Sequence, residues 1–349
     1  MAALAAGPLP AIASTATARW MGCRQVGESH FATLFDETGH VHLDVRLPGR
    51  GHDIVPSPSG QSVVIMARRP DRFAVIVDLK SGAVAHHLTA SPGHHFYGHG
   101  CFSADGSLFY TSENHYETGD GLIGVRDANK SFELLGHFPS GGIGPHEILL
   151  TNDGISLAIA NGGIRTHPDT GRSKLNLETM APSLTLVDTA TGALTSRHTL
   201  GSEHHQLSIR HLAAGPTGIA AALQYEGPKR NRVPLLALFD GTNLTLADTP
   251  SEVAKAMRNY AGSVTYDVSG NIIALTCPRG NLVSFWSSAD GAYLGAHRER
   301  DVCGIAALAT PGQFALTAGA IAFQASLDTI GTATEFAQTQ WDNHLVPIA

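Results

Sequence analysis

The 349-residue chain has few cysteines, few charges and no long apolar run. Its four cysteines are far apart and form no CxxC pair, so they indicate neither a zinc finger nor a disulfide framework. No stretch is uniformly apolar over roughly 18 residues, so no membrane-spanning helix is expected. Acidic residues outnumber basic ones by 30 to 23, and the net charge of −7 argues against nucleic acid as a partner.

Helical periodicity and familiar catalytic motifs are also scarce. Only residues 251–258 (SEVAKAMR) are expected to form a helix, and there is no nucleophile elbow, Walker loop or HExxH motif. Hydrophobic residues make up 43% of the chain, enough for a sizeable core and too many for a disordered protein. The 38 glycines and 18 prolines indicate many turns, and the 19 histidines nearly match lysine plus arginine.

The chain repeats a unit of four short strands. Apolar runs follow turn glycines at a spacing of about 40–50 residues, which is typical of propeller blades. The predicted fold is an all-β, single-domain, seven-bladed β-propeller over residues 19–349. Its inner strands are expected to begin near Gly51, Gly98, Gly144, Ile209, Ala261, Asp301 and Trp341.

The last unit holds one strand before the chain ends, and three further strand candidates precede the first unit. We therefore expect the strand near Trp341 to pair with N-terminal strands and close the ring, which removes exposed sheet edges. Residues 1–18 are alanine-rich and end in small residues. They are interpreted as a residual signal sequence, with a disordered leader as the alternative.

One position of the repeat is rich in histidine. Aligned inner strands carry histidine in five of seven blades, whereas random placement of 19 histidines would fill fewer than one such position. Because inner strands line the central channel, these side chains are expected to form a ring at one channel mouth. The candidate metal ligands are His52, His99, His146, His211 and His344, with Cys303 and Glu113 as further candidates.

Converging imidazoles suit iron, copper, zinc or nickel, and a thiolate would add a softer ligand. The alternative is a structural or merely polar channel mouth. In WD-type repeats a structural histidine lies several residues before the inner strand. Here the histidine opens the strand itself, which favours metal binding by part of the ring.

The second strands end on the face where the ring is expected, and polar side chains follow them. Glu113 or Glu147 could ligate an ion or orient a ligand histidine. Arg172 or Arg279 could hold a carboxylate or another anion. The other ligand-binding candidates on this face are Arg69, Glu147, Asn161, His167, Arg172, Gln224 and Arg279.

Long motifs between about Arg50 and Gly304 resemble a bacterial family known as domain of unknown function 1513. They are RGHD (50–53), ARRP (67–70), FYGHG (96–100), GIGPHE (142–147), ANGGI (160–164), KLNL (174–177), SIRHL (208–212), LQYEG (223–227), YAGSV (260–264) and PRG (278–280). The chain departs from the family pattern at His94 and His95, where the family often has arginine.

The resemblance implies an exported, periplasmic seven-bladed propeller, often with a twin-arginine signal. It also implies a link to iron acquisition, with imelysin-like or di-haem periplasmic proteins as partners. It supplies no activity. The ring of histidines further resembles nitrous oxide reductase, where histidines from seven blades hold a copper cluster, but no part of this chain resembles that enzyme's cupredoxin domain.

Three functions are compatible with the sequence. The first is an exported propeller that binds iron or copper through its histidine ring and takes part in metal acquisition or handling. The second is a metal-dependent oxidoreductase or hydrolase that acts on a small molecule at the same face. The third is a metal-free scaffold that docks imelysin-like partners.

Overall fold

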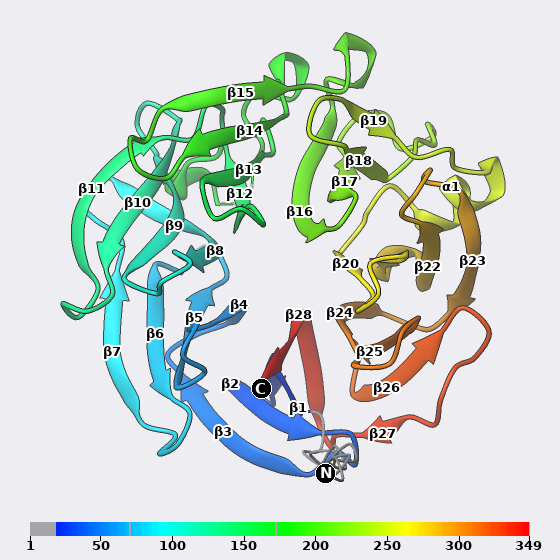
Figure 1. Cartoon of the computed structure of the whole chain (residues 1–349), viewed down its shortest axis with the longest axis horizontal. Coiled ribbons are helices and arrows are strands. Elements are labelled where there is room, and N and C mark those ends of the chain that lie inside the picture. Colours follow the sequence, from blue (N-terminus) through cyan, green and yellow to red (C-terminus); the bar gives the residue numbers. More distant parts are fainter. Residues whose placement is uncertain (1–18, 70, 172, 349) are drawn as a thin grey trace, which may run out of the picture.

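Seven four-stranded antiparallel sheets surround a central axis in the computed structural model (Figure 1). The structure describes residues 19–69, 71–171 and 173–348, so the predicted leader, residues 1–18, lies outside it. From the inner strand outward, the blades are β28 (Thr339–Ile348), β1 (Arg19–Val26), β2 (Ser29–Asp36), β3 (Val41–Leu47); β4 (Gly51–Pro56), β5 (Ser62–Ala67), β6 (Phe73–Asp78), β7 (Val84–Thr89); β8 (His94–Phe102), β9 (Leu108–His115), β10 (Asp120–Asp127), β11 (Glu133–Pro139); β12 (Pro145–Leu150), β13 (Ser156–Asn161), β14 (Ser183–Asp188), β15 (Leu194–His198); β16 (Leu207–Gly215), β17 (Gly218–Tyr225), β18 (Leu236–Phe239), β19 (Leu244–Leu246); β20 (Ser263–Tyr266), β21 (Ile272–Cys277), β22 (Leu282–Ser287), β23 (Tyr293–Arg298); and β24 (Val302–Ala307), β25 (Gln313–Ala318), β26 (Ile321–Ser326), β27 (Thr334–Glu335).

The prediction of a seven-bladed, all-β propeller is confirmed. The predicted helix is α1 (Ser251–Met257), in the connection between β19 and β20. Four short 3-10 helices lie in other connections, at Pro168–Thr170, Leu177–Thr179, Ser202–His204 and Pro278–Gly280. In the part of the chain that the structure describes, no helix is long and apolar enough to cross a membrane.

Burial along each blade follows from its position between two neighbours. The second strand of a blade is covered on both faces, so runs such as β5 (SVVIMA) and β21 (IIALTC) are almost wholly buried. The outermost strand has one face in water, and β3 therefore alternates between exposed and more buried side chains.

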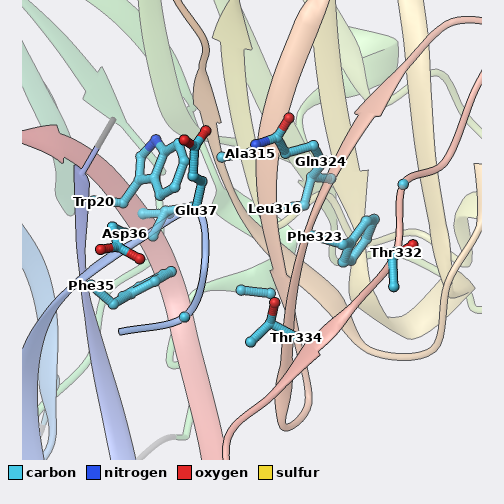
Figure 2. Close-up of a pocket in the computed structure, with 14 residues that line it drawn as sticks. Trp20, Phe35, Asp36, Glu37, Ala315, Leu316, Phe323, Gln324, Thr332 and Thr334 are labelled. Atoms are coloured by element: carbon cyan, nitrogen blue, oxygen red, sulfur yellow. The ribbon is translucent and has the colours of Figure 1, made fainter. Parts of the chain in front are cut away.

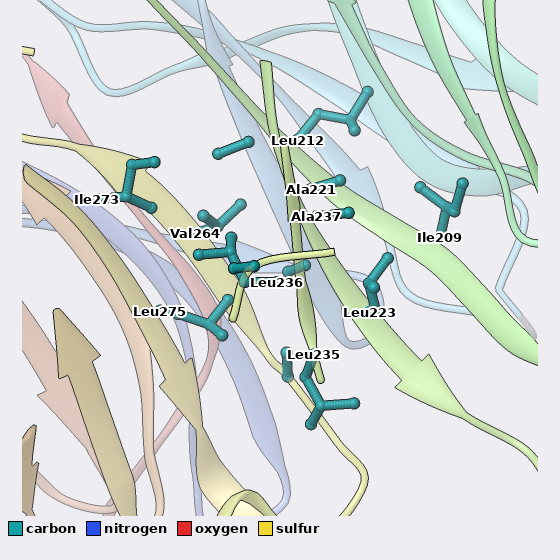
Figure 3. Packing of buried hydrophobic residues seen from close by; sticks show 14 of the residues in the cluster. Ile209, Leu212, Ala221, Leu223, Leu235, Leu236, Ala237, Val264, Ile273 and Leu275 are labelled. Carbon is teal, nitrogen blue, oxygen red and sulfur yellow. The ribbon is translucent and has the colours of Figure 1, made fainter. Parts of the chain in front are cut away.

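Apolar side chains fill the spaces between adjacent sheets. Figure 3 shows one such cluster, in which Leu212 and Leu223 of one blade face Val264 and Ile273 of the next. These contacts fix the angle between the blades. The blades in turn fix the inner strands, and with them the side chains that point toward the central axis.

The ring closes through the two ends of the described chain. β28 pairs antiparallel with β1, with Arg19 opposite Ile348 and Val26 opposite Thr339. Trp341 and Leu345 of β28 are buried in an apolar cluster with Trp20 and Phe35. The predicted closure is thus confirmed: one blade combines the last strand of the chain with the first three.

Candidate metal centre

The five histidines at the recurrent position converge near the axis of the ring. In chain order, and back from the last to the first, neighbouring imidazole centroids are 4.6–4.9 Å apart. All five side chains are buried, with exposures of 8% or less. We call them the histidine cluster: His52 on β4, His99 on β8, His146 on β12, His211 on β16 and His344 on β28.

The spacing within the cluster suits shared ligation of an ion. His52, His99 and His146 each have a ring nitrogen within 4.8 Å of the others, and so do His99, His211 and His344. Two nitrogens bonded to one ion at about 2.1 Å are at most about 4.2 Å apart. Side-chain rotations that move a nitrogen by about half an ångström therefore suffice, and His99 belongs to both groups.

Bulges in the inner strands place the histidines there. The pairing of β4 with β5 shifts between Gly51 and Ile54, and comparable shifts occur in β8, β12, β16, β24 and β28. A bulge re-aims the side chains beside it, in this case toward the axis. The blade with Ser263 in place of histidine pairs regularly and has no bulge.

Close packing in the cluster also requires a glycine. Gly98 precedes His99 and has a φ of +103°, a left-handed conformation that favours glycine. A Cβ at this residue would lie 2.8 Å from Cδ2 of His52. Gly98 therefore lets two histidines of adjacent blades approach each other.

Three carboxylates orient three of the histidines from the preceding blade. Asp342 lies 3.0 Å from Nδ1 of His52, and Asp53 lies 3.2 Å from Nδ1 of His99. Glu147 lies 2.9 Å from Nδ1 of His211 and also accepts a hydrogen bond from the backbone N–H of Leu212. A carboxylate at Nδ1 fixes the tautomer and leaves Nε2 available as a metal ligand.

The other two histidines have no carboxylate partner. His146 Nδ1 and His344 Nε2 are buried and accept or donate no hydrogen bond among the described residues. The preceding blades have glycine, Gly100 and Gly304, directly after the recurrent position, so they supply no carboxylate there. A buried polar atom without a partner costs about 1–3 kcal/mol, which a bound ion would offset.

The charge state of the cluster favours ligation. Burial lowers the pKa of four of the histidines, to about 4 for His344 and well below the usual value for the other three. Burial also opposes protonation of His99, but the Asp53 carboxylate raises its pKa instead. Burial raises the pKa of Glu147 to about 7. At pH 7 four imidazoles are therefore neutral, which is the form that binds metal.

Cys303 is on β24 at the recurrent position, but its sulfur belongs to neither three-histidine group. Burial raises the pKa of its thiol well above the usual value, and the Asp342 carboxylate acts in the same direction. The thiol is therefore protonated at neutral pH. The donor set of the cluster consists of imidazoles alone.

Glu113 lies in a different cluster, with His94 and His137 in the blade of β8–β11. Its carboxylate accepts hydrogen bonds from Thr111 at 2.7 Å and from Arg126 at 3.2 Å. His94 and His137 lie 3.3 and 3.1 Å from its other oxygen. These partners outweigh burial and hold the pKa of Glu113 at about 2. The carboxylate is thus fully hydrogen-bonded within the protein, apart from the histidine cluster.

The cluster borders a pocket with a strongly basic wall. His52, His146 and His211 line this pocket together with three of the predicted residues, Arg69, Gln224 and Arg279. It spans about 940 Å³ including its open mouth. We call it the basic pocket because its wall includes Arg68, Arg69, Lys174, Arg210 and Arg279.

The remaining predicted residues lie elsewhere. Asn161 is buried and bonded to Ser140 and Thr185, so it ties β13 to its neighbours. His167 is in a loop, 3.7 Å from Glu117. Arg172 lies outside the described residues. A second hollow, lined by Trp20, Phe35 and Phe323 among others, contains none of the predicted site residues (Figure 2).

A family model described as "Protein of unknown function (DUF1513)" matches residues 45–348. The chain belongs to this family. No curated protein matches it. Among solved structures, the β-propeller domain of Myceliophteria thermophila Cps50 (Swd1) has a TM-score of 0.61 and 12% identity, and covers 85% of this chain and 93% of that one. Hydrazine synthase from Kuenenia stuttgartiensis has a TM-score of 0.61 and 14% identity, and covers 89% and 93%. Such identities show the fold alone.

In this member of the family, two functional carboxylates were missed by sequence reasoning. Glu147 was predicted to orient a ligand histidine, but Asp53 and Asp342 were not singled out. A signal was available, since an acidic residue directly follows both His52 and His146. At the family's usual arginine position, His94 contacts Glu113, and burial lowers the pKa of His95 to about 4.

Proposed function

We propose that the protein binds a transition metal ion, iron or copper, through the histidine cluster and handles that metal in the bacterial cell envelope. One observation carries the metal site: buried imidazoles from five blades converge, and carboxylates of the preceding blades hold three of them by Nδ1. This is the outer-shell arrangement of metal-binding histidines. The cell-envelope part follows from the resemblance to an exported family linked to iron.

A purely structural cluster is the main rival, and its energetics count against it. Burying imidazoles and carboxylates costs free energy that an apolar core of the same volume would not cost. Two buried nitrogens, on His146 and His344, have no partner to offset that cost. Sites that give up stability in this way are typically functional.

Removing an orienting carboxylate tests the proposal without removing a ligand. Glu147→Gln keeps an acceptor for His211 Nδ1 but loses the negative charge, and we expect metal affinity to fall by about 10–100-fold. Affinity for Fe(II) and Cu(II) is measured by competition with a colorimetric chelator. The matched control is Glu133→Gln at the exposed start of the outer strand β11, which should bind like the wild type. Equal affinities for both variants would contradict the outer-shell role.

The pH dependence of binding follows from two raised pKa values. His99, protonated below its raised pKa, must lose its Nε2 proton to bind an ion, and below about pH 7 the Glu147–His211 pair holds a second displaceable proton. The other histidines are already neutral. We therefore expect affinity to fall with falling pH, with one to two protons released per ion at pH 6.5. Calorimetry in buffers of different ionisation enthalpy measures this number, and a value of zero would contradict the assignment.

A further inference from the structure

The charges that line the basic pocket are strongly unbalanced. Among its lining residues Glu226 is the one carboxylate, and it pairs with Lys174. Arg68 is paired with Asp342 at 2.8 Å. Among the described residues, neither Arg210 nor Arg279 forms an ion pair, and Arg69 adds a further positive charge at the same wall.

Arg210 shows the imbalance most clearly. Its Nε is buried and has no hydrogen-bond partner in the described part of the chain. A buried guanidinium without a counter-charge is unfavourable, and a second arginine in the same pocket increases the repulsion. His146, 5% exposed, likewise lines the pocket with an unpartnered Nδ1. Both unpartnered groups favour a ligand that brings negative charge and hydrogen-bond acceptors.

The arginines are held in place by aromatic rings. The guanidinium of Arg279 lies 4.1 Å from the ring centroid of Tyr260, and that of Arg69 lies 4.9 Å from that of Tyr97. Arg69 also donates a hydrogen bond to Thr166 at 2.8 Å. A guanidinium over an aromatic ring keeps its edge available, and that edge matches the two oxygens of a carboxylate.

We propose that the basic pocket binds a small organic polycarboxylate whose inner end reaches an ion on the histidine cluster. Arg69, Arg210 and Arg279 follow or belong to strands of three different blades, after β5, in β16 and after β21. Donors that approach from separate blades suit several carboxylates on one molecule better than one compact phosphate. The pocket volume is within the usual range for small ligands.

This inference deepens the proposed function and rests on it for the metal-facing end of the ligand. Carboxylate oxygens would add hard donors to an imidazole set, as iron coordination favours. The protein would then take up the metal as an anionic chelate rather than as a bare ion.

Calorimetric titration of citrate into the metal-free full-length protein tests the inference. We expect citrate to bind, and inorganic phosphate to bind at least tenfold more weakly. Arg279→Met, which leaves the cluster untouched, should weaken citrate binding by at least tenfold, and Arg279→Lys should restore it in part because it keeps the charge but not the fork. Lys80→Met, in the turn after β6, is the matched control for loss of one positive charge.

Three results would overturn the inference: no citrate binding by the folded wild type, equal binding by wild type and Arg279→Met, or phosphate binding as tight as citrate binding. If Arg279→Met does not fold, Arg69→Met takes its place. Metal loading of the same wild-type preparation from Fe(II) or Cu(II) chloride reports on the proposed function separately. A protein that loads metal but ignores citrate would refute the pocket proposal alone.

Discussion

Deletion of β28, residues 339–349, should abolish the folded ring. The strand supplies the buried side chains of Trp341, Leu345 and Ile348, each worth about 1.5–3 kcal/mol. Their sum, about 5–9 kcal/mol, is comparable with the whole stability of a typical domain, about 5–15 kcal/mol. The deletion also exposes the edge of β1. We expect no cooperative thermal transition by circular dichroism, and rapid proteolysis.

A circular permutant provides the control. Ile348 lies opposite Arg19 in the antiparallel pair of β28 and β1. Residues 339–348 placed before Arg19, with a short turn between them, should therefore re-form the pair and restore the transition. A truncated chain that melts like the full-length protein would show that β28 does not close the ring.

His99→Ala should have the largest effect on metal binding. His99 is the one residue in both three-histidine groups, and its side chain is fully buried. Loss of a ligand should cost more than the roughly 10–100-fold of an outer-shell partner, so metal retained after desalting should fall at least tenfold. Elemental analysis by mass spectrometry measures the metal, and a thermal melt confirms that the variant is folded.

Two further variants separate ligation from folding. His146 has no carboxylate partner, so His146→Ala removes a ligand without leaving an unpaired buried charge, and should lose metal with little change in melting temperature. His115→Ala, at the end of β9 and outside both three-histidine groups, should keep its metal. Equal metal loss in all three variants, or none in any, would refute the assignment of ligands. Lower melting temperatures without metal in any protein would favour the structural rival.

The blades and the histidine positions could be predicted because both repeat along the chain. Turn glycines mark each unit, and the distance from His52, His99, His146 and His211 to these glycines is nearly constant. The closing strand could be predicted because the last unit was incomplete.

Contacts between blades could not be predicted, because they depend on the curvature of the ring and on bulges that strand patterns do not reveal. Asp53 touches the histidine of the next blade, 46 residues along the chain, and Asp342 reaches across the closure to His52. For the same reason Glu113, a candidate for the ring from its place at the end of a strand, lies instead among partners of its own blade. The concentration of arginines at one pocket depends on three blades at once.

The most direct test is to locate the ion in wild-type protein loaded with Fe(II) or Cu(II), by anomalous X-ray diffraction at the metal edge. The account predicts one anomalous peak within the histidine cluster, with at least three imidazole nitrogens at about 2.1 Å and with His99 among them. A loaded crystal with no peak there, or with its peak at Glu113, His94 and His137, would contradict it.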